Sequence, residues 1–381
     1  MKRLSPVFLL LFLLLEVSHA QEDSLRRFFH LGLFSPISTN GKKASEYTSN
    51  FSLHLLWGRS KNSYGFSSAG LVNIAENNAY GLQIAGLVNR AGKPESGSYW
   101  DFDFNHYSGG TGKGLSIAGL MNLYSNYEGV LIAAGNNVNT LSGIQIGLLN
   151  GVQQKVSGAQ LGFMNGAFTL SGVQIGMGNI AKNGKGVQIG IFNDRGTASA
   201  FQIGIINEAK SNKYPIGLIN LIEDGHKKAG VGIDETGSII AEFRSGSCLY
   251  GIVGMGYNFI SGKHMVIEGG IGTRLYQLNK FSIDTELIGS LYSIPDMRMQ
   301  DDKDKSDHQF KAATKFSWRL LPAYKLSDKL ELFAGPSINY MYTHQKTNKK
   351  MLPSWHWWNK YTDKSFKQIH IGGIIGIQRT F

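Results

Sequence analysis

The chain has 381 residues, a net charge of +11 and one cysteine, Cys248, so it is long enough for two domains but cannot form a disulfide framework. Its 48 glycines show no collagen period, and 11% of its residues are aromatic, which excludes a collagen-like or disordered chain and favours β-structure with many turns. No run of 18 apolar residues follows Gln21, so the sequence contains no candidate for a helical membrane span.

We expect residues 1–20 to be a signal peptide. Lys2 and Arg3 form a basic start, residues 8–15 (FLLLFLLL) are an apolar run, and the small residues Ser18 and Ala20 precede a cleavage site before Gln21. An uncleaved anchor is the alternative. In an exported protein, the positive charge favours contact with anionic lipid, glycan or cell-wall polymer over nucleic acid. The alternative is that the positive charge serves only to keep the protein soluble.

One short unit recurs about eleven times between residues 59 and 225. Nine clear copies end on an asparagine that has a glycine three residues before it and an apolar residue two residues before it. The glycine–asparagine pairs are Gly70 and Asn73, Gly86 and Asn89, Gly119 and Asn122, Gly147 and Asn150, Gly162 and Asn165, Gly176 and Asn179, Gly190 and Asn193, Gly204 and Asn207, and Gly217 and Asn220. Two worn copies fill the wide gaps: GVLIAAGNN, with Ala134 and Asn137 at the two positions, and SYWDFDFN at 98–105.

The unit predicts a β-solenoid. Val and Ile alternate with Gln and Gly, as in strands, and stretches such as AKNGK (181–185) are typical turns. About fourteen residues suit one coil, and stacked coils place like residues about 4.8 Å apart, where asparagines can bond in ladders and only small residues fit between backbones. The alternative is one larger antiparallel β-barrel that includes the repeats, but it gives no reason for the common phase.

Residues 226–381 predict a small transmembrane β-barrel. Seven alternating segments are joined by short turns, such as 327–329, and by long polar loops at 296–308 and 345–364. The terminal Phe381 resembles the sorting signal of outer-membrane barrels. Because single-chain bacterial barrels have an even strand number, residues 28–38 within the segment 21–58 are assigned as an eighth strand, with the solenoid inserted after it. A soluble two-sheet β-domain is the alternative. The expected fold class is therefore all-β, a Gly/Asn-rich solenoid plus an antiparallel barrel of about eight strands.

The sequence offers no catalytic, cofactor or metal site. GIVGMG (251–256) lacks a following helix, and the aspartates at 296–307 favour a solvated loop over a calcium site. One exposed segment, WHWWNKY, is a candidate for binding sugar or lipid, with a membrane-interface anchor as the alternative. Its candidate residues are Trp355, Trp357, Trp358 and Tyr361.

Residues 67–220 resemble a surface-repeat family of envelope proteins known chiefly from Bacteroidetes and spirochaetes. The motifs that carry the resemblance are GFSSAGLVN, GLQIAGLVN, GLSIAGLMN, GIQIGLLN and GVQIGIFN, over about 40% of the chain. The resemblance implies no activity, catalytic residue or cofactor.

We therefore expect a non-enzymatic outer-membrane or cell-surface protein. Its barrel would anchor a repeat scaffold that spaces or binds, with membrane lipid and a glycan, cell-wall or protein ligand as partners. The alternatives are an outer-membrane channel for small solutes or lipid, and a periplasmic or secreted solenoid enzyme acting on polysaccharide. Sparse carboxylates in the repeats argue against the enzyme.

Overall fold

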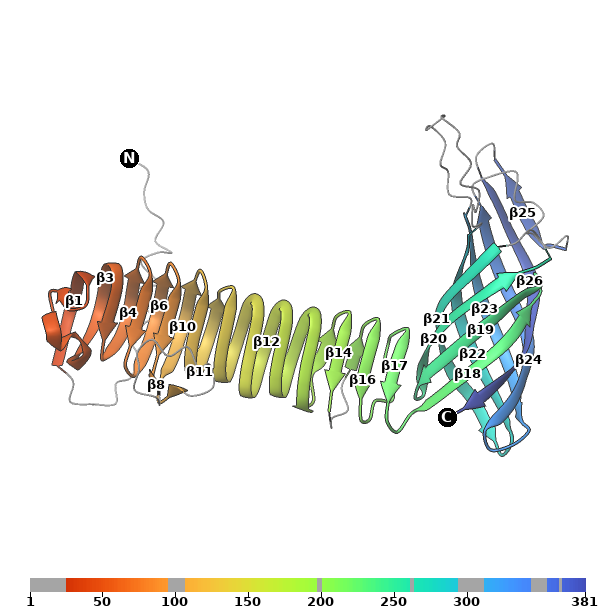
Figure 1. The fold of residues 1–381 in the computed structure, drawn as a ribbon, viewed down its shortest axis with the longest axis horizontal. Helices are drawn as coiled ribbons and strands as arrows, with labels where there is room; N and C mark the ends of the chain where they lie inside the picture. Colours follow the sequence, from red (N-terminus) through yellow and green to blue (C-terminus); the bar gives the residue numbers. More distant parts are fainter. Residues whose placement is uncertain are drawn as a thin grey trace, which may run out of the picture. The chain divides into compact units, whose positions relative to one another are not determined.

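The structure, a computed structural model, describes residues 25–94, 107–196, 201–260, 264–293, 312–343, 355–362 and 365–381. The predicted signal peptide, the worn copy at 98–105 and the aspartate loop lie outside these residues. The described residues are almost entirely β, with 80% strand and 2% helix. It divides into two compact units, residues 1–181 and residues 182–381, and the boundary falls inside the long element β12. Figure 1 shows the fold.

The N-terminal unit begins with β1 (Leu25–Phe34), β2 (Ile37–Ser38), the 3-10 helix η1 (Gly41–Glu46), β3 (Tyr47–Ser60), β4 (Asn62–Ala69), β5 (Val72–Ala75), β6 (Asn78–Ala85), β7 (Val88–Ala91), β8 (Lys93–Pro94), β9 (Tyr107–Ser108), β10 (Thr111–Ala118), β11 (Met121–Ile132) and β12 (Gly135–Gly184). The C-terminal unit continues with β13 (Val187–Ile189), β14 (Phe192–Arg195), β15 (Phe201–Ile203), β16 (Ile206–Ala209) and β17 (Ile219–Ile222). The barrel follows with β18 (His226–Asp234), β19 (Ser238–Gly246), β20 (Leu249–Asn258), β21 (His264–Leu278), β22 (Phe281–Ser293), β23 (Ala312–Lys325), β24 (Leu330–Thr343), β25 (Trp358–Tyr361) and β26 (Phe366–Thr380).

The repeats form a solenoid-like parallel stack of about ten turns. In the N-terminal unit each coil supplies one strand to each of two parallel ladders, for example β4 beside β6 and β5 beside β7. In the C-terminal unit β14, β16 and β17 continue the same pattern with Asn193, Asn207 and Asn220 in register. The predicted solenoid is confirmed, and the alternative of one large antiparallel barrel is wrong because the repeats pair in parallel.

The glycine at the third position before each asparagine is fixed by close stacking. A Cβ on Gly86 would lie 1.9 Å from the carbonyl oxygen of Gly70, and one on Gly162 would lie 2.3 Å from that of Gly147. No Cβ fits at such a distance, so these coils can stack at this corner only with glycine. The expectation that small residues separate stacked backbones is confirmed.

Register in the worn part of the repeat differs from the prediction. Asn136, and not Asn137, pairs with Asn122, which places Ala133 and not Ala134 at the glycine position. Asn122 also pairs directly with Asn89, so these two asparagines are neighbours in the ladder. The stack has about ten turns, one fewer than the predicted count of about eleven.

Residues 28–38 are not a barrel strand. Strand β1 pairs in parallel with β3, for example His30 with Ser52, and so belongs to the first coil of the solenoid. The eighth barrel strand is β18, which pairs antiparallel with both β19 and β26. The wrong assignment of the eighth strand has a physical cause. Strand β18 alternates only Ala229, Val231 and Ile233 with glycines, which is a weak strand signal. Residues 28–38 alternate apolar and other side chains strongly, as a solenoid strand does as well as a barrel strand. The solenoid therefore precedes the barrel and is not inserted in it.

The barrel is closed and has eight antiparallel strands, in the order β18 to β24 and then β26, with β26 paired back to β18. Strand β25 adds to β26 outside this ring. Three connections at one end, after β19, β21 and β23, have two to four residues, and the start of β18 and the C-terminus lie at that end too. The two longest connections, after β22 and after β24, are at the other end. Among the described residues, no helix is long and apolar enough to cross a membrane.

Candidate functional site

Side chains of the barrel strands alternate between an apolar exterior and an interior that holds charged groups beside small buried apolar clusters. On β23, Lys315 and Arg319 are buried, whereas the intervening Phe316 and Trp318 are 57% and 54% exposed. Their neighbours in the barrel follow the same rule, with exposed Leu287 and Leu291 on β22. A soluble barrel has the opposite arrangement, with an apolar core and a polar surface.

A chain of alternating charges crosses the interior. Arg319 donates from Nη1 to Glu242 Oε1 at 2.6 Å and from Nη2 to both carboxylate oxygens of Glu268 at 3.0 Å. Arg244 donates to the other oxygen of Glu242 at 3.0 Å and to Glu286 Oε1 at 2.7 Å. The order Glu268, Arg319, Glu242, Arg244, Glu286 thus alternates in sign and joins β19, β21, β22 and β23.

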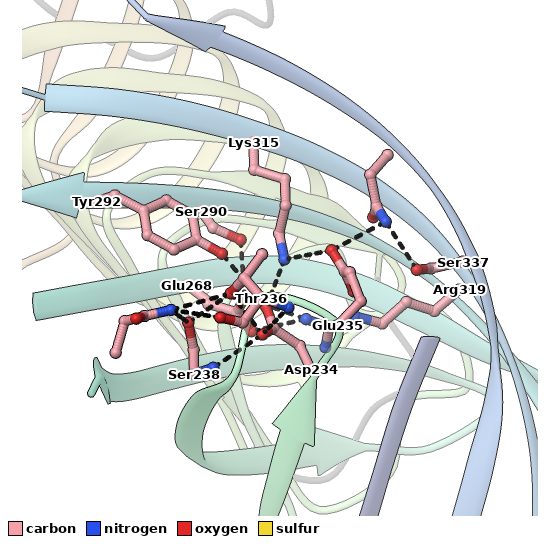
Figure 2. A network of polar contacts seen from close by, with 12 residues as sticks. Asp234, Glu235, Thr236, Ser238, Glu268, Ser290, Tyr292, Lys315, Arg319 and Ser337 are labelled. Atoms are coloured by element: carbon pink, nitrogen blue, oxygen red, sulfur yellow. Dashed lines mark hydrogen bonds and ion pairs between the residues drawn. The ribbon is translucent and has the colours of Figure 1, made fainter. Parts of the chain in front are cut away.

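A second cluster lies at the end of β18. Lys315 Nζ is 2.6 Å from Asp234 Oδ2 and 3.3 Å from Glu235 Oε1, and Figure 2 shows it directed between the two carboxylates. Tyr292 donates its hydroxyl to Asp234, and Asn339 donates its amide to Glu235. This cluster ties the first turn of the barrel to β22, β23 and β24.

A third pair closes the barrel seam near the other end. Lys228 on β18 lies 2.6 Å from Glu331 on β24, and Gln378 on β26 donates to the same carboxylate at 2.9 Å. Because an eight-stranded barrel has an interior just wide enough for side chains, these clusters fill it. Buried charges of this kind are stable only with opposite partners, which each charged residue named here has.

The asparagines predicted as scaffold form a ladder. Asn150 donates to Asn165 at 2.9 Å and Asn165 to Asn179 at 2.9 Å, while each also donates to a backbone carbonyl of the adjacent coil. In the C-terminal unit Asn193 donates to Asn207 and Asn207 to Asn220, at 2.9 and 2.8 Å. These buried amides bond along the stack, so their role is structural and they do not face a ligand.

Glutamines five residues before the later asparagines form a second ladder. Gln174 donates to Gln160 at 2.8 Å and Gln160 to Gln145 at 2.9 Å, all three fully buried. In the C-terminal unit Gln202 donates to Gln188 at 3.1 Å. The recurrence of Gln in GIQIG and GVQIG was visible in the sequence, so this ladder could have been predicted with the asparagines.

A histidine pair occupies the first coils. His54 Nε2 lies 3.3 Å from His30 Nε2, which is also 3.0 Å from the hydroxyl of Ser38. Burial lowers the pKa of both rings to about 4, and the charge of His54 contributes to the shift at His30. Both imidazoles are therefore neutral at pH 7 and act as packing groups.

The four aromatic candidates of the WHWWNKY segment lie together at the end of the barrel with the long connections. Trp355, Trp357, Trp358 and Tyr361 are all exposed, with Trp357 at 75%. Strand β25 attaches this segment to β26, and the Tyr361 ring packs on Phe366 at 4.3 Å. Phe381 is exposed at the opposite end, where its amide donates to the Lys227 carbonyl.

The charged groups of the barrel interior were not predicted from the sequence. Their signal was present: Glu242 and Arg244, or Lys315 and Arg319, lie at even spacing within predicted strands and so share one face. In the part of the chain that the structure describes, no group of three or more His, Cys, Asp and Glu residues could hold a metal ion. No protein-family model, curated protein or solved structure matches this chain.

Proposed function

We propose that the protein is an outer-membrane protein whose barrel is a closed, lipid-embedded anchor for a rigid, non-enzymatic solenoid. The observation that carries the proposal is the reversed polarity of the barrel, apolar outside and charged inside, which is the pattern of transmembrane β-barrels. The apolar exterior would be costly in water, because it forms a continuous surface and not scattered side chains.

The filled interior favours an anchor over a channel. Arg319 and Lys315 each bridge two carboxylates across the interior, so the space that a solute would cross is occupied by side chains. A pore would require these ion pairs to separate, and unpaired buried charges are costly.

The topology also favours one side of the membrane for the solenoid. The chain enters β18 at the end of the barrel where the connections are short, and in outer-membrane barrels the short turns are periplasmic. We therefore propose a periplasmic solenoid, with the WHWWNKY segment at the external end of the barrel.

Full-length protein folded into phospholipid vesicles tests the proposal. Lipids brominated at the middle of the acyl chain should quench the outward-facing Trp318, and the same preparation should show no discrete conductance in planar bilayers. The Trp318→Phe variant is the control that assigns the quenched signal. An unquenched Trp318 contradicts the membrane anchor, and stepwise conductance contradicts the closed interior.

A further inference from the structure

The solenoid carries an apolar edge on its outer surface. The residue two before the asparagine is large and exposed in eight of the nine clear repeats, at 63% for Leu148 and 48% for Ile205, and Leu218 in the ninth is half-buried. The neighbouring outward positions are apolar as well, including Ile146, Leu149 and Phe192. We call the row formed by the residues two before the asparagines of the nine clear repeats the apolar edge. Its members are Leu71, Leu87, Leu120, Leu148, Phe163, Met177, Ile191, Ile205 and Leu218.

In the C-terminal unit the outward positions that follow the apolar edge are polar. In the coil of Asn193, exposed Ile191 and Phe192 are followed by exposed Asp194, and in the coil of Asn207, exposed Glu208 and Lys210 follow Ile205. The outer surface of these two coils is therefore amphipathic, whereas in the N-terminal unit Phe168 and Ile180 are also exposed after their asparagines. Contiguous exposed apolar surface of this kind marks an interaction site and not ordinary surface composition.

Within the C-terminal unit, the apolar edge runs into the outer face of the barrel. Its last member, Leu218, lies in a hollow of about 970 Å³ with the outward-facing Met255, Ile267 and Leu291. A Cβ placed on the outward-facing Gly269 would lie 3.3 Å from a methyl carbon of Leu218. The barrel surface that contacts lipid and the apolar edge are thus one continuous apolar surface at this point.

Polar contacts fix the last coil beside the short turn after β19. The Asn220 amide donates to the Ser245 hydroxyl at 2.9 Å, and the Leu249 amide donates to the Lys213 carbonyl at 3.2 Å. Both barrel residues flank the two-residue turn between β19 and β20, at the end assigned to the periplasm. The last coils therefore lie at the periplasmic half of the barrel wall.

We propose that the apolar edge is a lipid-binding surface, and that its part in the C-terminal unit, from Ile191 to Leu218, contacts the periplasmic leaflet of the membrane holding the barrel. The proposal rests on the proposed function, because it takes the outer face of the barrel as lipid-facing. The edge buries its side chains among acyl chains at the interface, as the apolar face of an interfacial amphipathic element does, while the polar remainder faces water. The Leu148 to Met177 part of the edge, in the N-terminal unit, carries the same chemistry and binds the same kind of surface.

Depth-dependent quenching on the full-length chain tests the proposal. A polarity-sensitive fluorophore is attached to single cysteines in a Cys248→Ser background, in vesicles containing phosphatidylcholine spin-labelled near the headgroup. Ile191→Cys and Leu148→Cys report on the apolar edge. Asp194→Cys and Gln153→Cys are matched controls on the polar surface of nearby repeats, and Met255→Cys reports on the barrel wall.

The expected result is strong quenching at Ile191, Leu148 and Met255, with at least tenfold weaker quenching at Asp194 and Gln153. Quenching at Met255 without quenching at Ile191 overturns the lipid-binding edge and leaves the membrane anchor intact. No quenching at Met255 overturns the anchor, and the edge proposal with it. Efficient disulfide cross-linking between Leu148→Cys chains without quenching there assigns the edge to a second copy of the chain and overturns the proposal.

Discussion

Replacement of Arg319 by methionine should destabilise the barrel by about 4 kcal/mol. Arg319 forms one bond of 2.6 Å to Glu242 and two of 3.0 Å to Glu268. Removing one partner of a buried ion pair costs roughly 3–5 kcal/mol, because the remaining charge is left without compensation. Glu242 keeps its contact with Arg244, whereas among the described residues Glu268 keeps one hydrogen bond, from the Ser290 hydroxyl at 2.7 Å, so most of the cost arises at Glu268.

The free energy of unfolding is measured by urea titration of the protein in vesicles, with the folded fraction read from heat-modifiable electrophoretic mobility. Adding Glu268→Gln to Arg319→Met removes the uncompensated carboxylate charge and should restore about 2 kcal/mol or more of the unfolding free energy. Arg379→Met, at an exposed outward position, is the matched control and should change stability by less than about 0.5 kcal/mol. The reasoning fails if Arg319→Met stays within about 1 kcal/mol of the wild type, or if the Glu268→Gln change gives no recovery.

Three further predictions concern the solenoid. Asn165→Ala removes two ladder bonds and leaves the neighbouring asparagines without these partners, so the unfolding free energy of the solenoid should fall by about 2–3 kcal/mol. The control Asn137→Ala, outside the ladder, should lower it by less than about 0.5 kcal/mol. Equal losses in the two variants would contradict the register. Gly143→Ala places a Cβ 1.9 Å from a neighbouring carbonyl oxygen at a φ of 145°, so the free energy of unfolding should fall by roughly 3 kcal/mol and the urea midpoint should be clearly lower. An unchanged midpoint refutes the close stacking. Because folding lowers the pKa of His30 and His54 from 6.5 to about 4, their contribution to stability is complete above pH 6.5 and is lost as pH falls through 4. The hydrogen-exchange protection factors of the first coils, which relate each observed rate to the intrinsic rate at the same pH, should therefore fall over that window, and protection factors that do not change with pH exclude this linkage.

The solenoid could be predicted because its constraints repeat. Each coil meets the same neighbour, so the need for glycine at a backbone contact and for asparagine in a ladder recurs in phase along the sequence. Where the repeat is worn this information is lost. The segment AAGNN contains two adjacent asparagines, and only pairing with Asn122 selects Asn136. The strong alternation of residues 28–38 fits a solenoid strand and a barrel strand equally, which led to the wrong eighth strand.

The barrel interior was less predictable for a different reason. Even spacing shows that Lys315 and Arg319 share one face of their strand, but it does not show whether that face lies inside or outside the barrel. A charged face of an antiparallel strand is usually the solvent-exposed one, so the sequence pattern alone suggests the wrong side. Their partners Asp234, Glu242 and Glu268 lie on other strands, 51 to 81 residues away. The ion pairs therefore depend on barrel closure, which joins β18 to β26 across the whole domain and leaves no local pattern.

The most direct test of the central claim is the behaviour of the full-length protein made in a Gram-negative host. We expect it to fractionate with the outer membrane and to run faster in unheated than in boiled detergent samples, because a closed barrel resists detergent and stays compact. Recovery in the soluble periplasmic fraction, with the same mobility before and after boiling, would contradict a membrane-embedded barrel and remove the basis for the lipid-binding edge.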